Sequence, residues 1–574
     1  MTTTSNLGFG SLNTSGSGST SLGTTLFGVD VTKLVDNLVQ ARALTNTRRQ
    51  DKIDGNTAKL SAYATLQTKL EALRTASNPL RTPRVLSGDT NVFNTKQTLT
   101  TASGTIAASA LVGITAAENA EVGSHTLTIN RIASADTIAS SVSMPDSTST
   151  VVLTANTTLT LGGANVALTN TMSLTQIRDA INAENANTGV TASIVQASAT
   201  SYRMVLKSDD MGKAITLADD LGGAGLTELG LAASGATDTS LSAELVIDGV
   251  TALRSTNSVS DLVEGLSLEL FQSDAGKPMT IQVSNNLTGV SDAVTSFVTA
   301  YNDFVDFVKS QRVVGSEGTV GADQVLFNDN LLQANYRNLQ GIMSIGANGI
   351  STGALKTLND VGIELGADGK LSVEDSTKFE DALLNNLDEV KNLFGFGSDA
   401  SPGLSVVDRP DFIPTALLGK TITVNVTATD VDGMPTAASF TIDGNTVAAV
   451  ITNGFIRGAD GTDLEDFRIG YEGGVVGGTP YTGTFTPTQG IADQIAGALE
   501  NVLDPQNGDI KNTTSTLTDT NTRLKDQIDT LTKQLEIYRA RMLSQFQAAQ
   551  NVISALESAQ NSIKSYTDSL NSNN

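Results

Sequence analysis

A long heptad-spaced run near the C-terminus places the strongest constraint on how this chain can fold. Steps of four and three residues, taken in turn from Leu524 to Leu570, select apolar or small side chains at every position except Gln545. This spacing keeps one stripe facing a helical partner, as in coiled coils. No Pro or Gly interrupts the run, so one helix would extend over roughly 70 Å. A single compact domain cannot cover such a helix, which therefore needs a partner.

The N-terminal part of the chain offers that partner. One apolar face begins at Val31, with Asp30 or Thr32 as its cap, and a second stretch from Ile53 ends near Asn78 and Pro79. We predict that the proximal part of the C-terminal helix pairs with residues 53–73. The distal part, about 540–570, should contact other copies or other proteins, because the chain has no second stripe of that length. A purely intramolecular bundle is the alternative.

The predicted coiled-coil and assembly residues come from both ends of the chain. They are Leu60, Tyr63, Leu70, Leu524, Ile528, Leu531, Leu535, Tyr538, Met542, Ala549, Val552, Leu556, Ile563, Tyr566 and Leu570.

Between the helical ends, β-strand patterns and helical patterns alternate along the sequence. Short runs of β-forming residues separated by turns fill two blocks. Helical patterns separate the blocks, including one with Ser173 as cap and Gly189 as stop, and a hairpin turns at Asp368-Gly369. The chain is predicted to be an α+β multidomain protein with a helical coiled-coil stem and inserted β-rich head domains. The predicted segments are a flexible tail (1–27), N-terminal helices (28–94), one or two β-rich head domains (95–285), a helical stem domain with a hairpin (286–398), an additional β-rich domain (399–488) and the C-terminal helix and leg (489–574).

Composition excludes several classes of function. The net charge of −24 disfavours nucleic acid and anionic membrane surfaces as partners. The absence of Cys excludes disulfides and thiolate chemistry. No run of 18 apolar residues is present, so no membrane span is expected, and the Ser/Gly/Thr-rich start has no apolar core of a cleavable secretory signal.

Motifs for catalysis or metal binding are weak. His125, the one histidine, lies in a strand-like segment and is expected to be a packed or exposed strand residue. Asp430, Asp432 and Gly433 faintly resemble a calcium loop but lack its further ligands, and the acidic run at 460–466 reads as turns. We predict no enzyme activity, no catalytic, cofactor-binding or metal-binding residues, and no cofactor.

Several segments, in their order along the chain, resemble the flagellar filament cap family, also called hook-associated protein 2. The likeness covers nearly the whole chain except about 400–488. The segments that carry it are FGVDVTKLVDNLVQA (27–41), LSAYATLQTKLEAL (60–73), GSHTLTINRIASADTIAS (123–140), ITLADD (215–220), VIDGVTALRSTNSVSDLVEGLSLEL (246–270), SFVTAYNDFV (296–305), LNDVGIELGADGKLSVEDSTKFEDAL (358–383), VKNLFGF (390–396) and RLKDQIDTLTKQLEIYRARMLSQF (523–546).

The resemblance implies a ring-shaped homo-oligomer, a pentamer in this family, at the distal tip of the bacterial flagellum. It implies that the protein is extracellular and leaves the cell through the flagellar type III export apparatus with the help of a cytoplasmic chaperone. Flagellin and the hook–filament junction proteins are the implied partners, and the cap promotes flagellin folding and insertion and prevents its loss. The alternatives are a filament or junction subunit, or a tip adhesin that binds a surface ligand through residues 399–488.

Overall fold

The computed structural model describes residues 25–26, 29–84, 91–149, 151–314, 319–410, 412–472 and 480–571. The chain divides into two compact units. One contains residues 1–73, 302–340 and 497–574, and the other contains residues 74–301 and 341–496. The predicted flexible tail, residues 1–27, lies outside the described residues except for 25–26.

The first unit is built mainly from long helices. Helix α1 begins directly after Asp30, whose Oδ1 accepts a hydrogen bond from the Lys33 amide at 3.0 Å and so caps the helix, as predicted. It continues without a break through Gly55 and ends at Ser77, before Pro79, so the two predicted helical stretches form one helix. The helices of this unit, some of which continue beyond it, are α1 (Val31–Ser77), α7 (Leu287–Ser310), α8 (Asn330–Ile345), α11 (Ile491–Leu503) and α12 (Asp509–Asn571), and a short hairpin is formed by β1 (Thr25–Leu26) and β2 (Val29–Asp30).

The β-rich block between residues 95 and 285 contains two separate hydrophobic cores. The first core lies between a five-stranded sheet, in the order β13-β12-β5-β16-β3, and a three-stranded sheet, β14-β15-β4. Its elements are β3 (Lys96–Ala102), α2 (Ala108–Leu111), β4 (Val112–Ala116), β5 (Gly123–Arg131), α6 (Asp238–Leu241), β12 (Ala243–Ile247), β13 (Val250–Arg254), β14 (Ser258–Val259), β15 (Leu266–Leu270) and β16 (Pro278–Asn285).

The second core combines two three-stranded sheets, β6-β10-β9 and β11-β7-β8, with helix α3. Ser173 caps α3 and forms a reciprocal capping box with Gln176, and Gly189 stops the following short helix α4 at φ 62°, as the sequence predicts. The elements are β6 (Thr137–Ala139), β7 (Thr157–Leu161), β8 (Ala164–Leu168), α3 (Leu174–Ala183), α4 (Asn185–Thr188), β9 (Val190–Ser198), β10 (Ser201–Ser208), β11 (Leu217–Asp219) and α5 (Ala224–Glu228).

A small hairpin and two helices follow α8. Strands β17 (Ile363–Leu365) and β18 (Leu371–Val373) pair around the predicted turn, in which Gly369 adopts φ 80°. Helices α9 (Ser376–Asn385) and α10 (Leu387–Phe394) come next. The described residues also contain three single turns of 3-10 helix, at Asn78–Leu80, Val92–Asn94 and Leu358–Val361.

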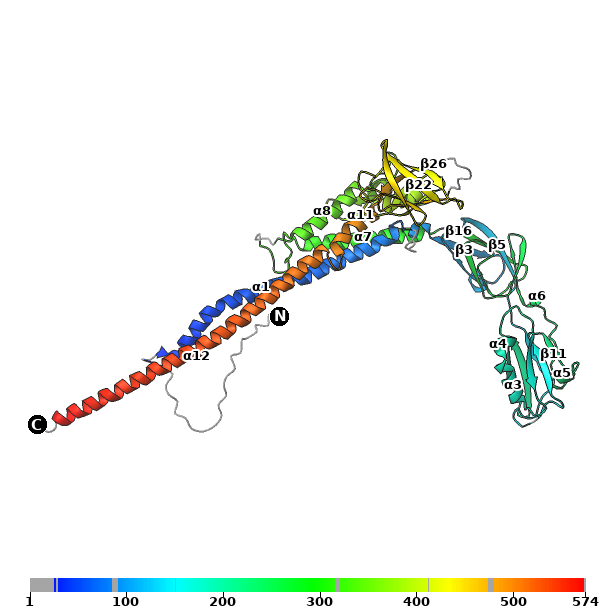
Figure 1. The fold of residues 1–574 in the computed structure, drawn as a ribbon, viewed down its shortest axis with the longest axis horizontal. Helices are drawn as coiled ribbons and strands as arrows, with labels where there is room; N and C mark the ends of the chain where they lie inside the picture. Colours follow the sequence, from blue (N-terminus) through cyan, green and yellow to red (C-terminus); the bar gives the residue numbers. More distant parts are fainter. Residues whose placement is uncertain are drawn as a thin grey trace. The chain divides into compact units, whose positions relative to one another are not determined.

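The additional β-rich segment forms one eight-stranded sheet (Figure 1, yellow), in the order β19-β26-β21-β22-β23-β24-β25-β20. Its two outermost strands, β19 and β20, are joined by only three residues, 401–403, so the sheet must curve until its edges meet. Phe440, Phe467 and Phe485 fill its core. The strands are β19 (Phe396–Ala400), β20 (Leu404–Asp408), β21 (Ile422–Thr429), β22 (Pro435–Ile442), β23 (Asn445–Thr452), β24 (Phe455–Gly458), β25 (Arg468–Tyr471) and β26 (Tyr481–Gln489).

A buried ion cluster joins this sheet to helix α11. Arg409, one residue after β20, places its Nη2 3.0 Å from both carboxylate oxygens of Asp493, and Arg81 Nε lies 2.8 Å from the same carboxylate. Asp493 is fully buried, and the guanidinium of Arg409 also stacks on the Phe396 ring at 4.4 Å. The eight-stranded sheet is therefore tied to helix α11 through buried charged side chains.

Candidate assembly surface

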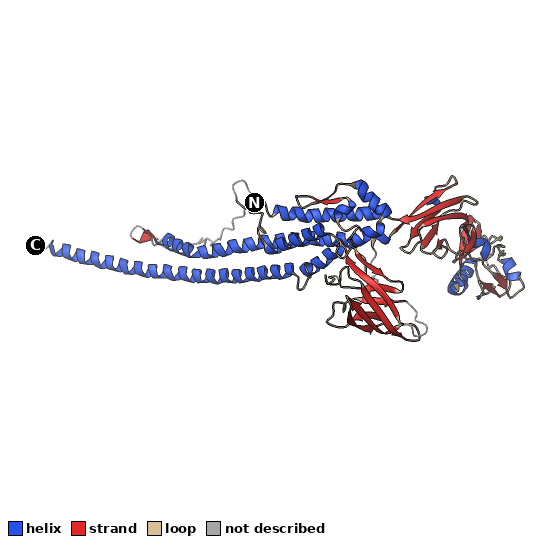
Figure 2. Ribbon diagram, turned by 90° about the horizontal axis from the view of Figure 1, so that it is seen from above, coloured by secondary structure: helices blue, strands red, loops and turns tan. Residues whose placement is uncertain are grey.

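Helices α1 and α12 lie side by side and antiparallel in the first unit (Figures 1 and 2). Three polar contacts define their register. Asp36 meets Arg539, Asn46 Nδ2 donates to the Ile528 carbonyl at 3.2 Å, and Asn56 Nδ2 donates to Asn521 Oδ1 at 2.8 Å. The stripe at 524–546 thus lies against residues 31–53 and not against the predicted 53–73, about half the length of α1 away, whereas the preceding part of α12 contacts that stretch at Asn56.

Apolar side chains hold this helix pair together. Val35, Val39 and Leu535 are buried, and further side chains from both helices pack around them: Val31, Ala43, Leu531, Tyr538, Met542, Leu543 and Phe546. Four of the predicted stripe residues, Leu531, Leu535, Tyr538 and Met542, belong to this cluster. The cluster ends near the start of α1, so among the described residues the partner of α12 ends there too.

Polar side chains flank the apolar seam. Arg539 Nε lies 2.7 Å from Asp36 Oδ1, and this hydrogen bond raises the pKa of Arg539. The Arg42 guanidinium sits 4.1 Å from the centre of the Tyr538 ring, which is a cation–π distance. Sequence reasoning missed these residues, although charged residues next to a heptad stripe are the usual signal for partner choice.

The predicted residues on the second half of α1 lie in the interior of the helical unit. Tyr63 and Leu70 are buried, and Leu60 is half-buried. The Tyr63 hydroxyl donates to Asp329 Oδ2 at 2.6 Å. The side chain of Lys69, on the same stretch of helix, lies 2.8 Å from Asp303. Tyr63 and Leu70 therefore stabilise the helical unit and are not accessible to another chain.

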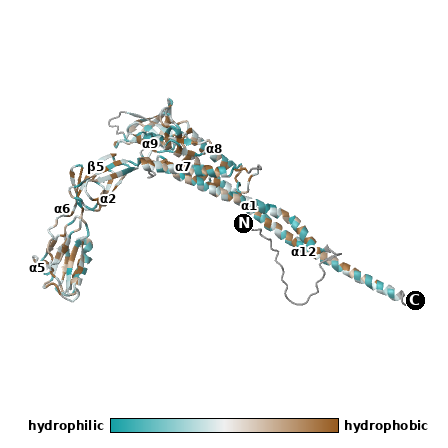
Figure 3. Ribbon diagram, turned by 180° about the vertical axis from the view of Figure 1, so that it is seen from behind, coloured by the Kyte–Doolittle hydropathy of each residue, from teal (hydrophilic) through white to brown (hydrophobic). Residues whose placement is uncertain are grey.

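The distal half of α12 extends beyond the start of α1 (Figure 1, red) and carries its apolar stripe uncovered. Val552, Leu556, Ile563 and Tyr566 are 60–68% exposed. Ala549 is also exposed, and the side chain of Leu570 lies outside the described residues. Figure 3 shows hydrophobic residues interspersed with hydrophilic ones along this free end. The remaining predicted residues, Leu524 and Ile528, are half-buried in the paired part.

Tyr63 makes the stability of the helical unit sensitive to alkaline pH. Burial, together with the hydrogen bond to Asp329, raises the pKa of Tyr63 above its ordinary value near 10. Above pH 10 the unfolded chain loses this proton while the folded chain keeps it, so stability falls as the pH rises. We expect Tyr63→Phe to be about 1.5–3 kcal/mol less stable than the wild type at pH 8, with the difference shrinking above pH 10. Denaturant unfolding of both proteins at pH 8 and at a pH above 10 checks this.

The exposed Tyr566 provides the control for that experiment. Tyr566→Phe removes the hydroxyl of a side chain that is 68% exposed, so this variant should have the stability of the wild type at pH 8. A constant difference between Tyr63→Phe and the wild type across this pH range would contradict the role assigned to Tyr63.

Side chains with catalytic potential have structural roles in the described part of the chain. His125 lies in β5, and its Nδ1 is 2.7 Å from Asp248 Oδ2, a contact that lowers the pKa of Asp248. Asp430 Oδ1 accepts hydrogen bonds from the amides of Asp432 and Met434, and Glu465 accepts one from Gly461, so these acidic residues stabilise turns, as predicted. Among the described residues, no group of three or more acidic or His side chains could hold a metal ion.

None of the helices in the described ranges is long and apolar enough to cross a membrane.

Comparisons with known proteins identify the family. Residues 240–558 match the family model described as Flagellar hook-associated protein 2 C-terminus, and residues 27–136 match the corresponding N-terminus model. Residues 123–210 match the family model described as Flagellin hook IN motif. The segment 123–140 lies inside this match, and the segment 215–220 lies outside it.

Two relatives found by sequence agree with these matches. Flagellar hook-associated protein 2 of Escherichia coli K12 is 28% identical over 368 residues, covering 60% of this chain and 74% of the relative. The B-type flagellar hook-associated protein 2 of Pseudomonas aeruginosa is 26% identical over 439 residues, covering 70% and 86%. The crystal structure of the flagellar cap protein FliD D1-D2-D3 domains from Escherichia coli is 27% identical, with a TM-score of 0.43, covering 58% of this chain and 89% of that one. The C-terminus model alone matches more than half of the residues of this chain, which therefore belongs to the flagellar hook-associated protein 2 family.

Proposed function

We propose that this protein is the cap at the distal end of the bacterial flagellar filament, where copies of the chain form a ring that promotes the folding and insertion of flagellin and prevents its loss. Membership of the hook-associated protein 2 family supports the cap function and does not favour a filament or junction subunit. The family resemblance is the basis for a ring of five copies.

The uncovered stripe of α12 is the observation that carries the assembly part of this proposal. Four large apolar side chains, Val552, Leu556, Ile563 and Tyr566, project from a helix that has no partner at this end among the described residues. Isolated helices with an exposed apolar stripe are unstable or sticky in water. Neighbouring cap subunits and flagellin are the partners that would cover it, and contacts of this modest size can exchange as each flagellin subunit adds.

The route to the tip is also part of the proposal. Export through the flagellar type III apparatus requires an unfolded chain, and a chain without cysteine cannot be trapped by disulfides on the way. A cytoplasmic export chaperone and the hook–filament junction proteins are the further partners that the family resemblance suggests. Adhesion to a surface ligand through the eight-stranded sheet stays a prediction from the sequence.

Immunogold electron microscopy of intact flagella tests the cap function. Antibodies raised against the β-rich domains should label only the distal tip. Label along the filament or at the hook would overturn the proposal and make this chain a filament or junction subunit.

A further inference from the structure

The paired part of the terminal helices is basic, although the chain as a whole is strongly acidic. Residues 31–60 and 523–546 together contain eleven Lys and Arg but only six Asp and Glu, a net charge of +5. The whole chain carries −24, so the rest of it carries −29. A local reversal of this size favours a partner of the opposite sign and selects its orientation.

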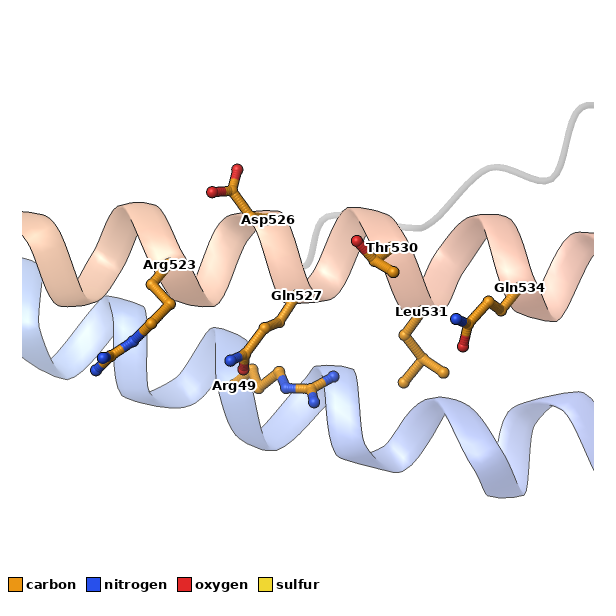
Figure 4. Close-up of a pocket in the computed structure, with 7 residues that line it drawn as sticks. All are labelled: Arg49, Arg523, Asp526, Gln527, Thr530, Leu531 and Gln534. Atoms are coloured by element: carbon orange, nitrogen blue, oxygen red, sulfur yellow. The ribbon is translucent and has the colours of Figure 1, made fainter.

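A shallow groove between α1 and α12 concentrates this charge (Figure 4). Arg49 of α1 and Arg523 of α12 line it together with the amide side chains of Gln527 and Gln534. Asp526 is the carboxylate among the lining residues, and in Figure 4 its side chain points away from the facing helix. Arg49 Nη1 donates to Asn46 Oδ1 at 3.1 Å, and within the described ranges neither arginine forms an ion pair.

The residues that line the groove on α12 have the spacing of a second coiled-coil stripe. Arg523, Gln527, Thr530, Gln534 and Ile537 follow one another in steps of four and three residues. Ile537 at the end of this stripe is 70% exposed, and Leu531 lines the groove beside it. A stripe with this period fits another helix lying along the pair, with the charge of Arg523 at one end, polar contacts along its centre and an apolar contact at Ile537.

We propose that this groove docks an acidic amphipathic helix of another protein, with Asp or Glu side chains opposite Arg49 and Arg523 and an apolar side chain against Ile537. This rests on the proposed function, because it makes the terminal helices the part that contacts the filament. A second copy of the same helix pair fits poorly, since two surfaces of net charge +5 repel each other. Repulsion therefore keeps residues 31–60 and 523–546 of one cap subunit from packing on the same residues of a neighbour, and contact between copies is left to the distal end of α12.

Two synthetic helical peptides, used as probes with the full chain, test this proposal. They share the same apolar heptad positions, and one carries Glu at the flanking positions where the other carries Lys. The Glu peptide should bind at least about tenfold more tightly at low salt and lose this advantage as salt screens the charges. This preference would oppose the overall charge of −24, which by itself attracts the Lys peptide.

Charge-reversal variants locate the binding. The double variant Arg49→Glu with Arg523→Glu should lose Glu-peptide binding, whereas Lys207→Glu with Lys213→Glu, an equal change of charge at exposed positions of a β-rich domain, should keep it. Circular dichroism confirms that both variants are folded, and Arg49→Gln with Arg523→Gln should give an intermediate loss.

Three results would overturn the proposal: binding of neither peptide, equal or tighter binding of the Lys peptide, or equal loss in both double variants. Sedimentation of the full chain tests the other candidate for the groove, which is a second copy of this chain. If Arg49→Glu with Arg523→Glu changes self-association and leaves peptide binding unaltered, the groove is an interface between copies, and the proposal of an acidic partner is wrong. Immunogold label at the filament tip tests the cap function separately, so either idea can fail alone.

Discussion

Replacing Asp493 with Asn should lower the free energy of unfolding by about 3–5 kcal/mol. Asp493 is fully buried and is the carboxylate that Arg409 and Arg81 both contact. The side chain of Arg409 is only 3% exposed, so Asp493→Asn removes a negative charge that the buried guanidinium contacts directly. Removing one member of a buried ion pair lowers the free energy of unfolding far more than removing one member of an exposed pair, because water cannot reach the buried charge that remains.

An exposed ion pair between two segments that flank strands of the same sheet provides the control. Lys420 and Asp443 lie 2.9 Å apart with side chains 47% and 62% exposed, so Asp443→Asn should cost less than about 1 kcal/mol. Near-ultraviolet circular dichroism can follow unfolding of this sheet through Tyr471 and Tyr481, whose rings lie 5.1 Å apart. Equal transition midpoints for Asp493→Asn and Asp443→Asn would show that the buried cluster does not hold the sheet to α11.

The same cluster changes how a deletion of residues 399–488 should be interpreted. Such a deletion removes Arg409 together with the sheet, and it leaves Asp493 buried with fewer cationic partners. Loss of the oligomer after that deletion could therefore follow from a destabilised stem. Only a deletion variant that also carries Asp493→Leu separates a contribution of the sheet to assembly from its contribution to stability.

Local signals predicted the helices and turns well. Asp30 and Ser173 act as caps, and Gly369 takes the positive φ that the Asp-Gly turn requires. Each of these features depends on a few neighbouring residues and on backbone sterics, so the sequence alone is sufficient.

Features set by contacts between distant residues could not be predicted in the same way. A heptad stripe fixes which face of α12 is covered but not which stretch of α1 covers it, since Val35 and Leu66 are equally suitable apolar residues. The register depends on Asp36, Asn46 and Asn56 finding partners nearly five hundred residues away. The buried Arg409 gave no signal either, because arginine is normally exposed and nothing near it in sequence marks it as buried.

The burial of the proposed assembly residues within the chain could be predicted only in part. Val552, Leu556, Ile563 and Tyr566 are exposed, as expected for a part of α12 that has no partner among the described residues. Tyr63 and Leu70 carry the same apolar periodicity but lie in the interior of the helical unit. Apolar periodicity indicates that a residue is buried, but it does not indicate whether the residues that bury it belong to the same chain or to another one.

Replacing the four exposed stripe residues Val552, Leu556, Ile563 and Tyr566 with Ser should abolish assembly and leave the fold intact. These side chains are already 60–68% exposed, so their removal changes few intramolecular contacts and should leave the melting temperature of the main transition unaltered. Burying them against another subunit would contribute about 4–8 kcal/mol, at roughly 1.5–3 kcal/mol for each full side chain. A loss of that size weakens association by more than about a thousandfold.

The matched control lies on the same helical segment but off the stripe. Gln547, Asn551, Gln560 and Asn561 are exposed polar residues, and replacing them with Ser introduces the same four low-propensity side chains without removing apolar surface. Sedimentation of each purified chain measures association, and flagellin lost to the medium measures capping in the cell. The stripe variant should remain dissociated and lose flagellin, whereas the control variant should behave like the wild type. If both variants assemble normally, the exposed end of α12 is not the surface that holds cap subunits together, and if both fail, helix stability at that end matters more than its apolar stripe.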